Sequence, residues 1–334
     1  MFRKHGKTIF PATPCLEINP DNIAKITEQI RNKIEATSKA LTVAIYNNKG
    51  GVGKTTTVVN LAATLTRHKK KVLVIDFDPN QHDLTDSLNI PLGNSELYDC
   101  LIDKQNLVDI KQAVCSYTKN FKGGITLSFD VIPVDRQLAE AGEDQIRQKI
   151  SPHSLRKKLE SLRHEYDYIL IDAPPNWRQY SISAIYAADV VLMPVKPNDI
   201  NSLKNTATTI QQYIPEIQKS RQAKTQGIEW GAIALPIFLN GGNLTDAAKV
   251  KAEKAIFTII EQVKSESNFD LTAFFFPRYI RGKNTNIYAM PHSAYIANSA
   301  FDSIPAAYKY KVAYDYYSRR VQLIERLKRF FNEI

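Results

Sequence analysis

A glycine-rich stretch with two lysines is the part of the sequence whose residue types and spacing most clearly indicate chemistry. The residues, in chain order, are Lys49, Gly50, Gly51, Val52, Gly53, Lys54, Thr55 and Thr56. Glycines let the backbone take positive φ and approach an anion closely, and the N–H groups at a helix N-terminus point toward negative charge. The stretch therefore predicts a loop for nucleotide phosphates, with Lys54 on the β- and γ-phosphates and the Thr55 hydroxyl on Mg²⁺.

Three aspartates stand where two apolar segments end. Asp76 and Asp78 close the segment that starts at residue 71, and Asp172 closes the segment that starts at residue 166. Ligands of open α/β sheets bind at the carboxyl ends of parallel strands. Carboxylates there can hold Mg²⁺, directly or through its water shell. The alternative is that Asp76 and Asp78 only cap the following helix.

Alternating strand and helix patterns surround these residues. Strands are expected at 41–46, 71–79, 127–133, 166–172, 190–195 and 230–239. Helical spacing occurs at 54–67, 83–88, 107–117, up to about 149, 151–162, 207–214, 244–264 and 314–334. The pattern predicts an α/β fold: a mostly parallel twisted sheet with helices on both faces and the nucleotide at the strands' carboxyl ends.

Residues 1–40 read as a short N-terminal extension, and residues 41–334 as one nucleotide-binding domain that includes the C-terminal helix. The extension shows one helix with isoleucines at helical spacing, Ile23, Ile26, Ile30 and Ile34. A helix-turn-helix domain needs at least two helices and a supporting core, so we expect no operator-reading domain there.

Composition narrows the classes of partner and compartment. Hydrophobic residues make up 43% of the 334 residues, enough for a sizeable core, and no apolar run reaches the ~20 residues of a membrane span. Three cysteines far apart indicate neither a disulfide framework nor a metal site, which favours a reducing cytoplasm. The net charge of +10 favours nucleic acid or an anionic membrane as a partner, with simple solubility charge as the alternative.

The glycine-rich loop departs from the usual G-x-x-x-x-G-K-S/T pattern, because Asn48 stands where the first glycine belongs and Lys49 follows it. In this form it resembles the deviant Walker A motif of the ParA/MinD ATPases, a deviant P-loop NTPase family. Residues 75–81 resemble the family's D-x-D-P-Q motif, except that Asn80 is inserted before Gln81, and residues 172–175 resemble its D-x-P-P motif.

The resemblance implies roles for individual residues. Lys49 would cross a dimer interface to the partner's phosphates, and Lys49, Lys54 and Asp78 would serve catalysis. ATP would be held by residues 49–56, and Mg²⁺ by Thr55, Asp76 and Asp172. The segment 276–281 resembles the family's I-P-R-N-V-R sequence, with Tyr279 in place of asparagine.

That last segment implies further sites. Pro277 would lie beside the adenine, and Arg281 would contribute to DNA binding, supplemented by Lys283 and by the helix that carries Lys249, Lys251 and Lys254. The alternative for these three helix lysines is an ordinary solvated helix face.

The function that the resemblance implies is a DNA partition ATPase. ATP would close a homodimer that binds nonspecific DNA, and slow, partner-stimulated hydrolysis would release it. A centromere-binding or cargo-adaptor protein would be a partner, and the protein would be cytoplasmic and associated with the nucleoid. A scaffold with a vestigial nucleotide site is disfavoured because all three motifs are present.

Three alternatives concern other parts of the chain. The basic amphipathic segment 314–334 resembles the membrane-binding helix of MinD, although such a stripe more often packs on the fold. Cys100 and Cys115 lack the glycine-rich turns of iron–sulfur relatives, so free thiols are expected. The tyrosines at 308–317 precede a long apolar helix, which disfavours the tyrosine-rich tail of a bacterial tyrosine kinase.

Overall fold

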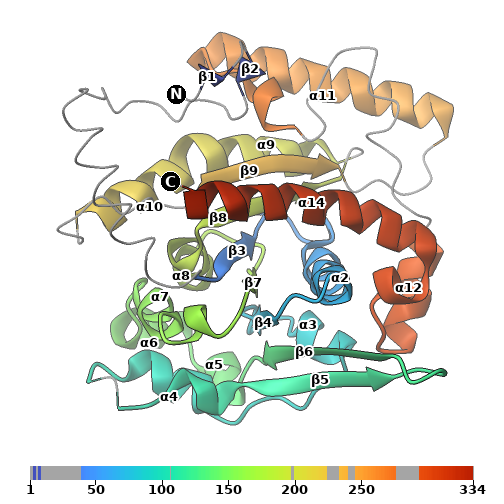
Figure 1. Ribbon diagram of the computed structural model, residues 1–334. Helices are drawn as coiled ribbons and strands as arrows, with labels where there is room; N and C mark the ends of the chain where they lie inside the picture. Colours follow the sequence, from blue (N-terminus) through green and yellow to red (C-terminus); the bar gives the residue numbers. More distant parts are fainter. Residues whose placement is uncertain are drawn as a thin grey trace.

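The computed structural model describes residues 3–4, 7–8, 39–105, 107–196, 199–223, 233–239, 245–275 and 293–333 (Figure 1). The strands are β1 (Arg3–Lys4), β2 (Lys7–Thr8), β3 (Leu41–Ile45), β4 (Val72–Asp76), β5 (Cys115–Asn120), β6 (Thr126–Ile132), β7 (Tyr168–Asp172), β8 (Val190–Val195) and β9 (Ile233–Leu239). The α-helices are α2 (Lys54–Arg67), α3 (Asp83–Ser87), α4 (Glu96–Ile102), α5 (Arg136–Glu140), α6 (Glu143–Lys149), α7 (Ser154–Leu159), α8 (Gln179–Ala187), α9 (Ile200–Thr208), α10 (Ile214–Gln222), α11 (Asp246–Ser267), α12 (Ser293–Phe301), α13 (Ala306–Lys309) and α14 (Lys311–Glu333). Short 3₁₀ turns are η1 (Ile110–Ala113), η2 (Leu162–His164) and η4 (Leu271–Phe274), and η3 (Thr209–Tyr213) is a π-helical turn.

Seven of the described strands form one twisted sheet in the order β5-β6-β4-β7-β3-β8-β9. Neighbouring strands are parallel except for β5, which pairs antiparallel with β6 at one edge. The strands β3, β4, β7 and β8 are buried along their whole length, as expected for parallel strands with both faces covered. The predicted fold class is confirmed.

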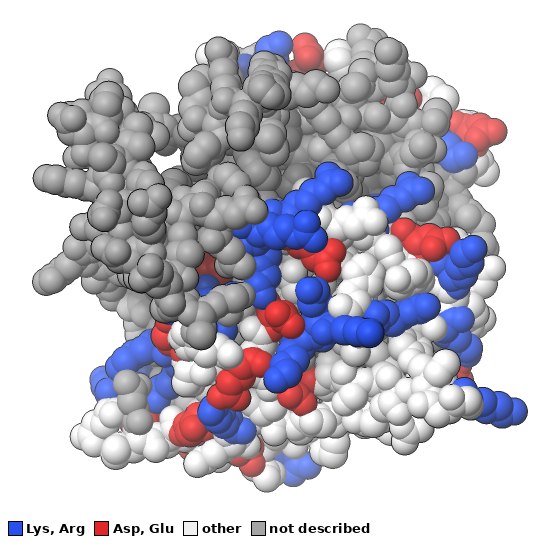
Figure 2. Space-filling model, in the orientation of Figure 1, with Lys and Arg blue, Asp and Glu red and all other residues white. Residues whose placement is uncertain are grey.

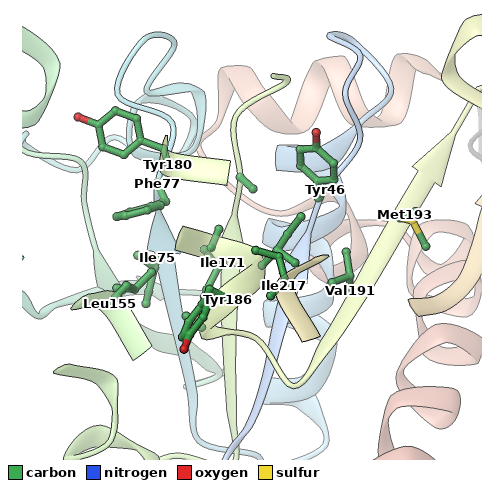
Figure 3. Close-up of a cluster of buried hydrophobic side chains, with 14 of the residues drawn as sticks. Tyr46, Ile75, Phe77, Leu155, Ile171, Tyr180, Tyr186, Val191, Met193 and Ile217 are labelled. Carbon is green, nitrogen blue, oxygen red and sulfur yellow. The ribbon is translucent and has the colours of Figure 1, made fainter. Parts of the chain in front are cut away.

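Helices cover both faces of this sheet because successive side chains of each strand point to opposite sides. On one face, Val74 of β4 belongs to an apolar cluster with side chains of α2, α13 and α14. On the other face, Ile75 and Ile171 belong to a cluster with Leu155 of α7 and Tyr186 of α8 (Figure 3). Both faces of the sheet are therefore packed against helices, and its carboxyl edge can position the side chains of a site.

The predicted helix over 107–117 is wrong. Residues 110–113 form only the 3₁₀ turn η1, and residues 115–120 form the edge strand β5. The strand is set by its partner β6, to which a turn at Gly123 (φ 84°) and Gly124 (φ 73°) connects it. Two adjacent glycines with positive φ between strand-forming segments are a hairpin signal that the helical spacing of apolar residues obscured.

The C-terminal helix α14 is docked on the fold. Val321 and Ile324 are fully buried in the cluster that includes α2, and Lys328 Nζ donates to the backbone oxygen of Asp167 at 2.9 Å. At the other end of the interface, the Arg67 guanidinium lies 4.0 Å from the centre of the Tyr314 ring. A docked helix, which the stripe spacing favoured, is therefore what the described part of α14 shows.

Other predictions differ in extent only. The helix expected at 244–264 is α11, and the one at 207–214 lies within the continuous run from α9 through α10. The polar helix expected up to about residue 149 is interrupted at Ala141 between α5 and α6. Cys100 is buried and Cys115 half-buried, as predicted, and neither forms a disulfide bond with a described residue. The helix expected within residues 1–40 lies outside the described residues. In the described chain, we found no helix combining the length and apolarity of a membrane span.

Candidate functional site

The glycine-rich loop follows the carboxyl end of β3, the strand between β7 and β8, and leads into α2. Gly51 and Gly53 have φ of 70° and 87°, in the left-handed region that favours glycine. A β-carbon at Gly51 would lie 3.9 Å from the nearest side-chain atom, which leaves room for it. Glycine is therefore favoured at this position by the positive φ and not by crowding. Gly53 is the N-cap of α2 and offers no capping side chain, which leaves the first N–H groups of the helix to an anion.

Lys54 lies inside this loop. The residue is 6% exposed, and its Nζ donates to the Lys49 backbone oxygen at 3.2 Å. Burial lowers the pKa of Lys54, while the nearby carboxylates of Asp172 and Asp78 act in the opposite direction. The arrangement supplies one largely desolvated cation at the point where a phosphate would enter.

Lys49, five residues earlier, has the opposite environment. Its side chain is 43% exposed, and its Nζ lies 3.9 Å from Oδ2 of Asp199. Asp199 caps α9, where its other carboxylate oxygen accepts from the backbone N–H groups of Asn201 and Ser202. Lys49 thus faces outward from the loop, while Lys54 faces inward.

Two asparagines fix the start of the loop, and sequence reasoning missed both. Asn47 Nδ2 donates to the backbone oxygens of Pro194 (2.9 Å) and Ser202 (3.1 Å). Asn205 Nδ2 donates to the backbone oxygen of Asn48 at 2.5 Å. The only signal in the sequence was that Asn47 directly follows a predicted buried strand. The hydrogen-bond partners of both asparagines lie about 150 residues away in sequence.

The carboxylates predicted from the strand ends do meet. Asp76 and Asp172 are in register across β4 and β7, and Ile45 of β3 is in register with Asp172. The Asp76 oxygens accept from the Thr85 N–H (2.9 Å), the Thr85 hydroxyl (2.6 Å) and the Asp78 N–H (3.3 Å). Asp76 therefore also anchors α3, a role that the sequence did not reveal because Thr85 carries no motif.

Burial dominates the electrostatics of these acids. It raises the pKa of Asp76 to about 6, against the opposing hydrogen bonds from Thr85. Burial and then the charge of Asp76 raise the pKa of Asp172 far above its usual range, while the Thr55 hydrogen bond and the charge of Lys54 lower it. Burial also raises the pKa of Asp78, against the N–H of Asn80 and the charge of Lys54. Closely spaced buried carboxylates of this kind are suited to a cation.

The residues present fit Mg²⁺. Oδ1 of Asp172 is buried and has no hydrogen-bond partner among the described residues, and the Thr55 hydroxyl bonds to the same carboxylate. Within the described chain, no group of three or more Asp, Glu, His or Cys side chains is arranged to hold a metal unaided. Mg²⁺ commonly completes its shell with water and phosphate oxygens, so such a donor set suits it.

Of the remaining predicted site residues, the structure describes only those on α11. Pro277, Arg281 and Lys283 lie outside the described residues. Lys249 lies on α11 with 42% of its side chain exposed, and its Nζ lies 3.0 Å from Oδ1 of Asp246. Lys251 and Lys254 are exposed on the same helix.

Comparison with known proteins places these features in a family. The family model described as "AAA domain" (AAA_31) matches residues 40–226, more than half of the chain. The sporulation initiation inhibitor protein Soj of Bacillus subtilis is 36% identical over 179 residues, 52% of this chain and 66% of Soj. The chromosome partitioning protein ParA of Myxococcus xanthus is 33% identical over 157 residues, 46% of this chain and 51% of that protein. The chain thus spans between about half and two thirds of the length of these relatives.

Solved structures share the fold. The septum site-determining protein MinD of Pyrococcus horikoshii, complexed with Mg-ADP, has a TM-score of 0.53 at 19% identity, covering 86% of this chain and 98% of that chain. The ParA of pNOB8 bound to nonspecific DNA has a TM-score of 0.52 at 22% identity, covering 85% and 99%. The predicted resemblance is confirmed: the chain belongs to the AAA_31 family of AAA domains, as a Soj-like member of the ParA/MinD ATPases.

Proposed function

We propose that this protein is a partition ATPase that binds ATP with Mg²⁺, closes into a homodimer around the nucleotides, binds nonspecific DNA and releases it on hydrolysis. The observation that carries the proposal is the pair of lysines in one loop: Lys54 is buried beside Asp172, and Lys49 faces outward. A nucleotide site formed by one chain alone needs only the inner lysine, Lys54. The outer one supports a site shared between two copies of the chain.

The chain's own groups would divide the work of hydrolysis. The loop N–H groups and Lys54 would hold and neutralise the phosphates. Thr55, Asp172 and Asp76 would hold Mg²⁺, which supplies charge neutralisation at the phosphate oxygens when bound. Asp78, two residues beyond the end of β4, would orient the attacking water through its carboxylate.

Charge supports DNA as the macromolecular partner. The chain has a net charge of +10, and a ParA of the same fold has been solved on nonspecific DNA. Figure 2 shows lysine and arginine side chains gathered where α14 crosses the face, and Arg319, Arg326 and Arg329 are exposed on that helix. We propose Arg281, Lys283 and Lys249 as further DNA contacts, with Pro277 beside the adenine.

The cellular setting follows from that proposal. A DNA-bound ATPase would be cytoplasmic and associated with the nucleoid, and a centromere-binding or cargo-adaptor protein would stimulate its hydrolysis. The Soj and ParA relatives support this setting through the sporulation and chromosome partitioning functions in their names.

A membrane-cycling function like that of MinD is the second candidate, because the exposed face of α14 is basic. A membrane helix must also offer an apolar face to lipid. In α14 that face includes Val321 and Ile324, which are buried against the fold. The helix would have to undock first, so DNA is the better-supported partner.

The test measures retention on nonspecific DNA and on anionic liposomes, each with ATP, with ADP and without nucleotide, across a salt series. The proposal predicts ATP-dependent retention on DNA that falls steeply with salt through counterion release. A protein lacking residues 319–334 should show no change in liposome retention. Retention on liposomes alone, lost with that deletion, would replace the proposal with the membrane function.

A further inference from the structure

A second basic site lies away from the nucleotide loop, in a hollow between α4, α6 and α7, at the lower left of Figure 1. Its volume is about 260 Å³. Four lysines line it: Lys104 from the loop after α4, Lys149 from α6, and Lys157 and Lys158 from α7. None of its lining residues belongs to the glycine-rich loop or to the three aspartates.

The hollow contains one carboxylate, and that carboxylate is already saturated. Asp103 accepts from the Val108 N–H (2.7 Å), the Gln105 N–H (3.0 Å) and Lys158 Nζ (3.1 Å). The backbone N–H of Val108 and then Lys158 lower the pKa of Asp103 to about 2, so it stays ionised and committed to these donors. Lys158 is only 8% exposed and gives a second hydrogen bond to the Val108 oxygen. Asp103 therefore neutralises Lys158 and is not free to neutralise the other lysines.

The other three lysines line the hollow without a carboxylate partner among the described residues. Lys149 Nζ donates to the hydroxyl of Tyr98 at 3.1 Å, which fixes its position without neutralising it. Lys104 and Lys157 are exposed, and in the described chain no carboxylate lies within ion-pair distance of Lys104, Lys149 or Lys157. Like charges gathered at one hollow repel one another, and a multivalent anion would relieve that repulsion.

We propose that this hollow binds a small anion with two or more phosphate groups, such as an oligophosphate or a phosphorylated metabolite. Lysine is a point-charge partner for phosphate, and the Ser151 and Ser154 hydroxyls in the lining can donate to its oxygens. The buried side chain of Leu101 forms an apolar part of the wall. The small volume of the hollow, about 260 Å³, favours a small ligand over an acidic protein segment, which would reach only the rim lysines. The proposal does not depend on the partition function.

The test titrates inorganic pyrophosphate into the full chain by calorimetry, with the nucleotide loop filled by saturating ADP. The informative variant carries Lys149→Gln and Lys157→Gln. Its matched control carries Lys219→Gln and Lys264→Gln. These substitutions remove the same amount of charge from two exposed lysines outside the hollow, on α10 and α11. Removing one lysine charge at contact distance in water should weaken pyrophosphate binding by roughly a factor of five. The double variant should therefore bind pyrophosphate at least about tenfold more weakly than the wild type.

The expected result is one bound pyrophosphate per chain in the wild type and the control, weaker binding in the hollow variant, and the same ADP affinity in all three. ADP affinity also verifies that each variant is folded, and the single variant Lys104→Gln provides a milder second test. Equal pyrophosphate binding in the two double variants, or none in the wild type, would overturn the proposal. Binding of a polyglutamate peptide without binding of pyrophosphate would overturn it in favour of a protein-docking surface.

Discussion

Lys54 and Lys49 show how neighbouring residues of one type receive different tasks from their surroundings. The first is enclosed by the loop and by Asp172 and Asp78, and burial lowers its pKa. The second is in solvent beside Asp199. A lysine that is partly desolvated interacts more strongly with a bound phosphate than an exposed one does, because water screens it less. The inner lysine is therefore the one on which nucleotide affinity should depend.

Replacing Lys54 tests that dependence. Lys54→Ala should weaken ATP binding by at least about 2 kcal/mol, the scale of a charged hydrogen bond that is lost. The measurement is a titration with a fluorescent ATP analogue in the presence of Mg²⁺. Lys219→Ala, at an exposed position of α10, is the matched control and should bind normally. Equal affinity in both variants would show that Lys54 does not contact the phosphates.

The raised pKa of Asp76 predicts how stability depends on pH. Its folded value is about 6 against an ordinary 3.8, so in this window the folded chain binds more protons than the unfolded chain. Stability then falls as pH rises from about 4 to about 6. Two pKa units correspond to about 3 kcal/mol, an order-of-magnitude figure.

Asp76→Asn removes this titration while keeping an oxygen for Thr85. Urea unfolding at several pH values between 4 and 7 should show the variant gaining stability relative to the wild type as pH rises. A difference between the two proteins that stays constant across this range would contradict the burial of an ionisable Asp76.

At the scale of elements, α14 is the helix whose placement decides between two functions. Ile324 is fully buried against the fold, and Arg326, two positions on, is exposed. Ile324→Ala should lower the free energy of unfolding by about 2–5 kcal/mol, whereas Arg326→Ala should change it by less than about 0.5 kcal/mol. Chemical denaturation measures both. Equal, small effects would indicate that α14 is undocked in solution and available to a membrane.

Strands and helices were predictable where their own side chains decide the outcome. The parallel strands β4 and β7 are continuous apolar runs, and the loop between β3 and α2 carries its glycines in sequence. Strand β5 was not predictable in this way, because only Tyr117 among its six residues is buried and the pairing with β6 creates it. An edge strand takes its conformation from its neighbour rather than from its own pattern.

The residues of the candidate site likewise differ in whether the sequence alone could predict them. The motifs located Lys54, Asp76 and Asp172, since the two aspartates end apolar strands and Lys54 begins the helix that follows the glycine-rich loop. The contacts of Asn47 and Asn205 could not be predicted, because their partners lie about 150 residues away in sequence. Only the pairing of β8 with β3 and the packing of α9 on β8 bring them together.

At the scale of the whole molecule, we propose that the loop, the sheet edge and the outward lysine form a site that a second copy of the chain completes. In a symmetric dimer, Lys49 of each protomer would act at its partner's site. Two inactive variants with different substitutions could then form a mixed dimer with one active site. Lys49→Ala removes the lysine that a protomer gives, and Asp78→Asn removes the carboxylate that a protomer uses itself.

Mixing these two variants is the most direct test of the shared site. We predict that each variant alone hydrolyses no ATP, and that an equal mixture recovers up to about a quarter of wild-type turnover. Random pairing makes about half of the dimers mixed, and each mixed dimer has one intact site. Wild-type turnover by Lys49→Ala alone, or a mixture as inactive as its components, would contradict a lysine that acts across the dimer.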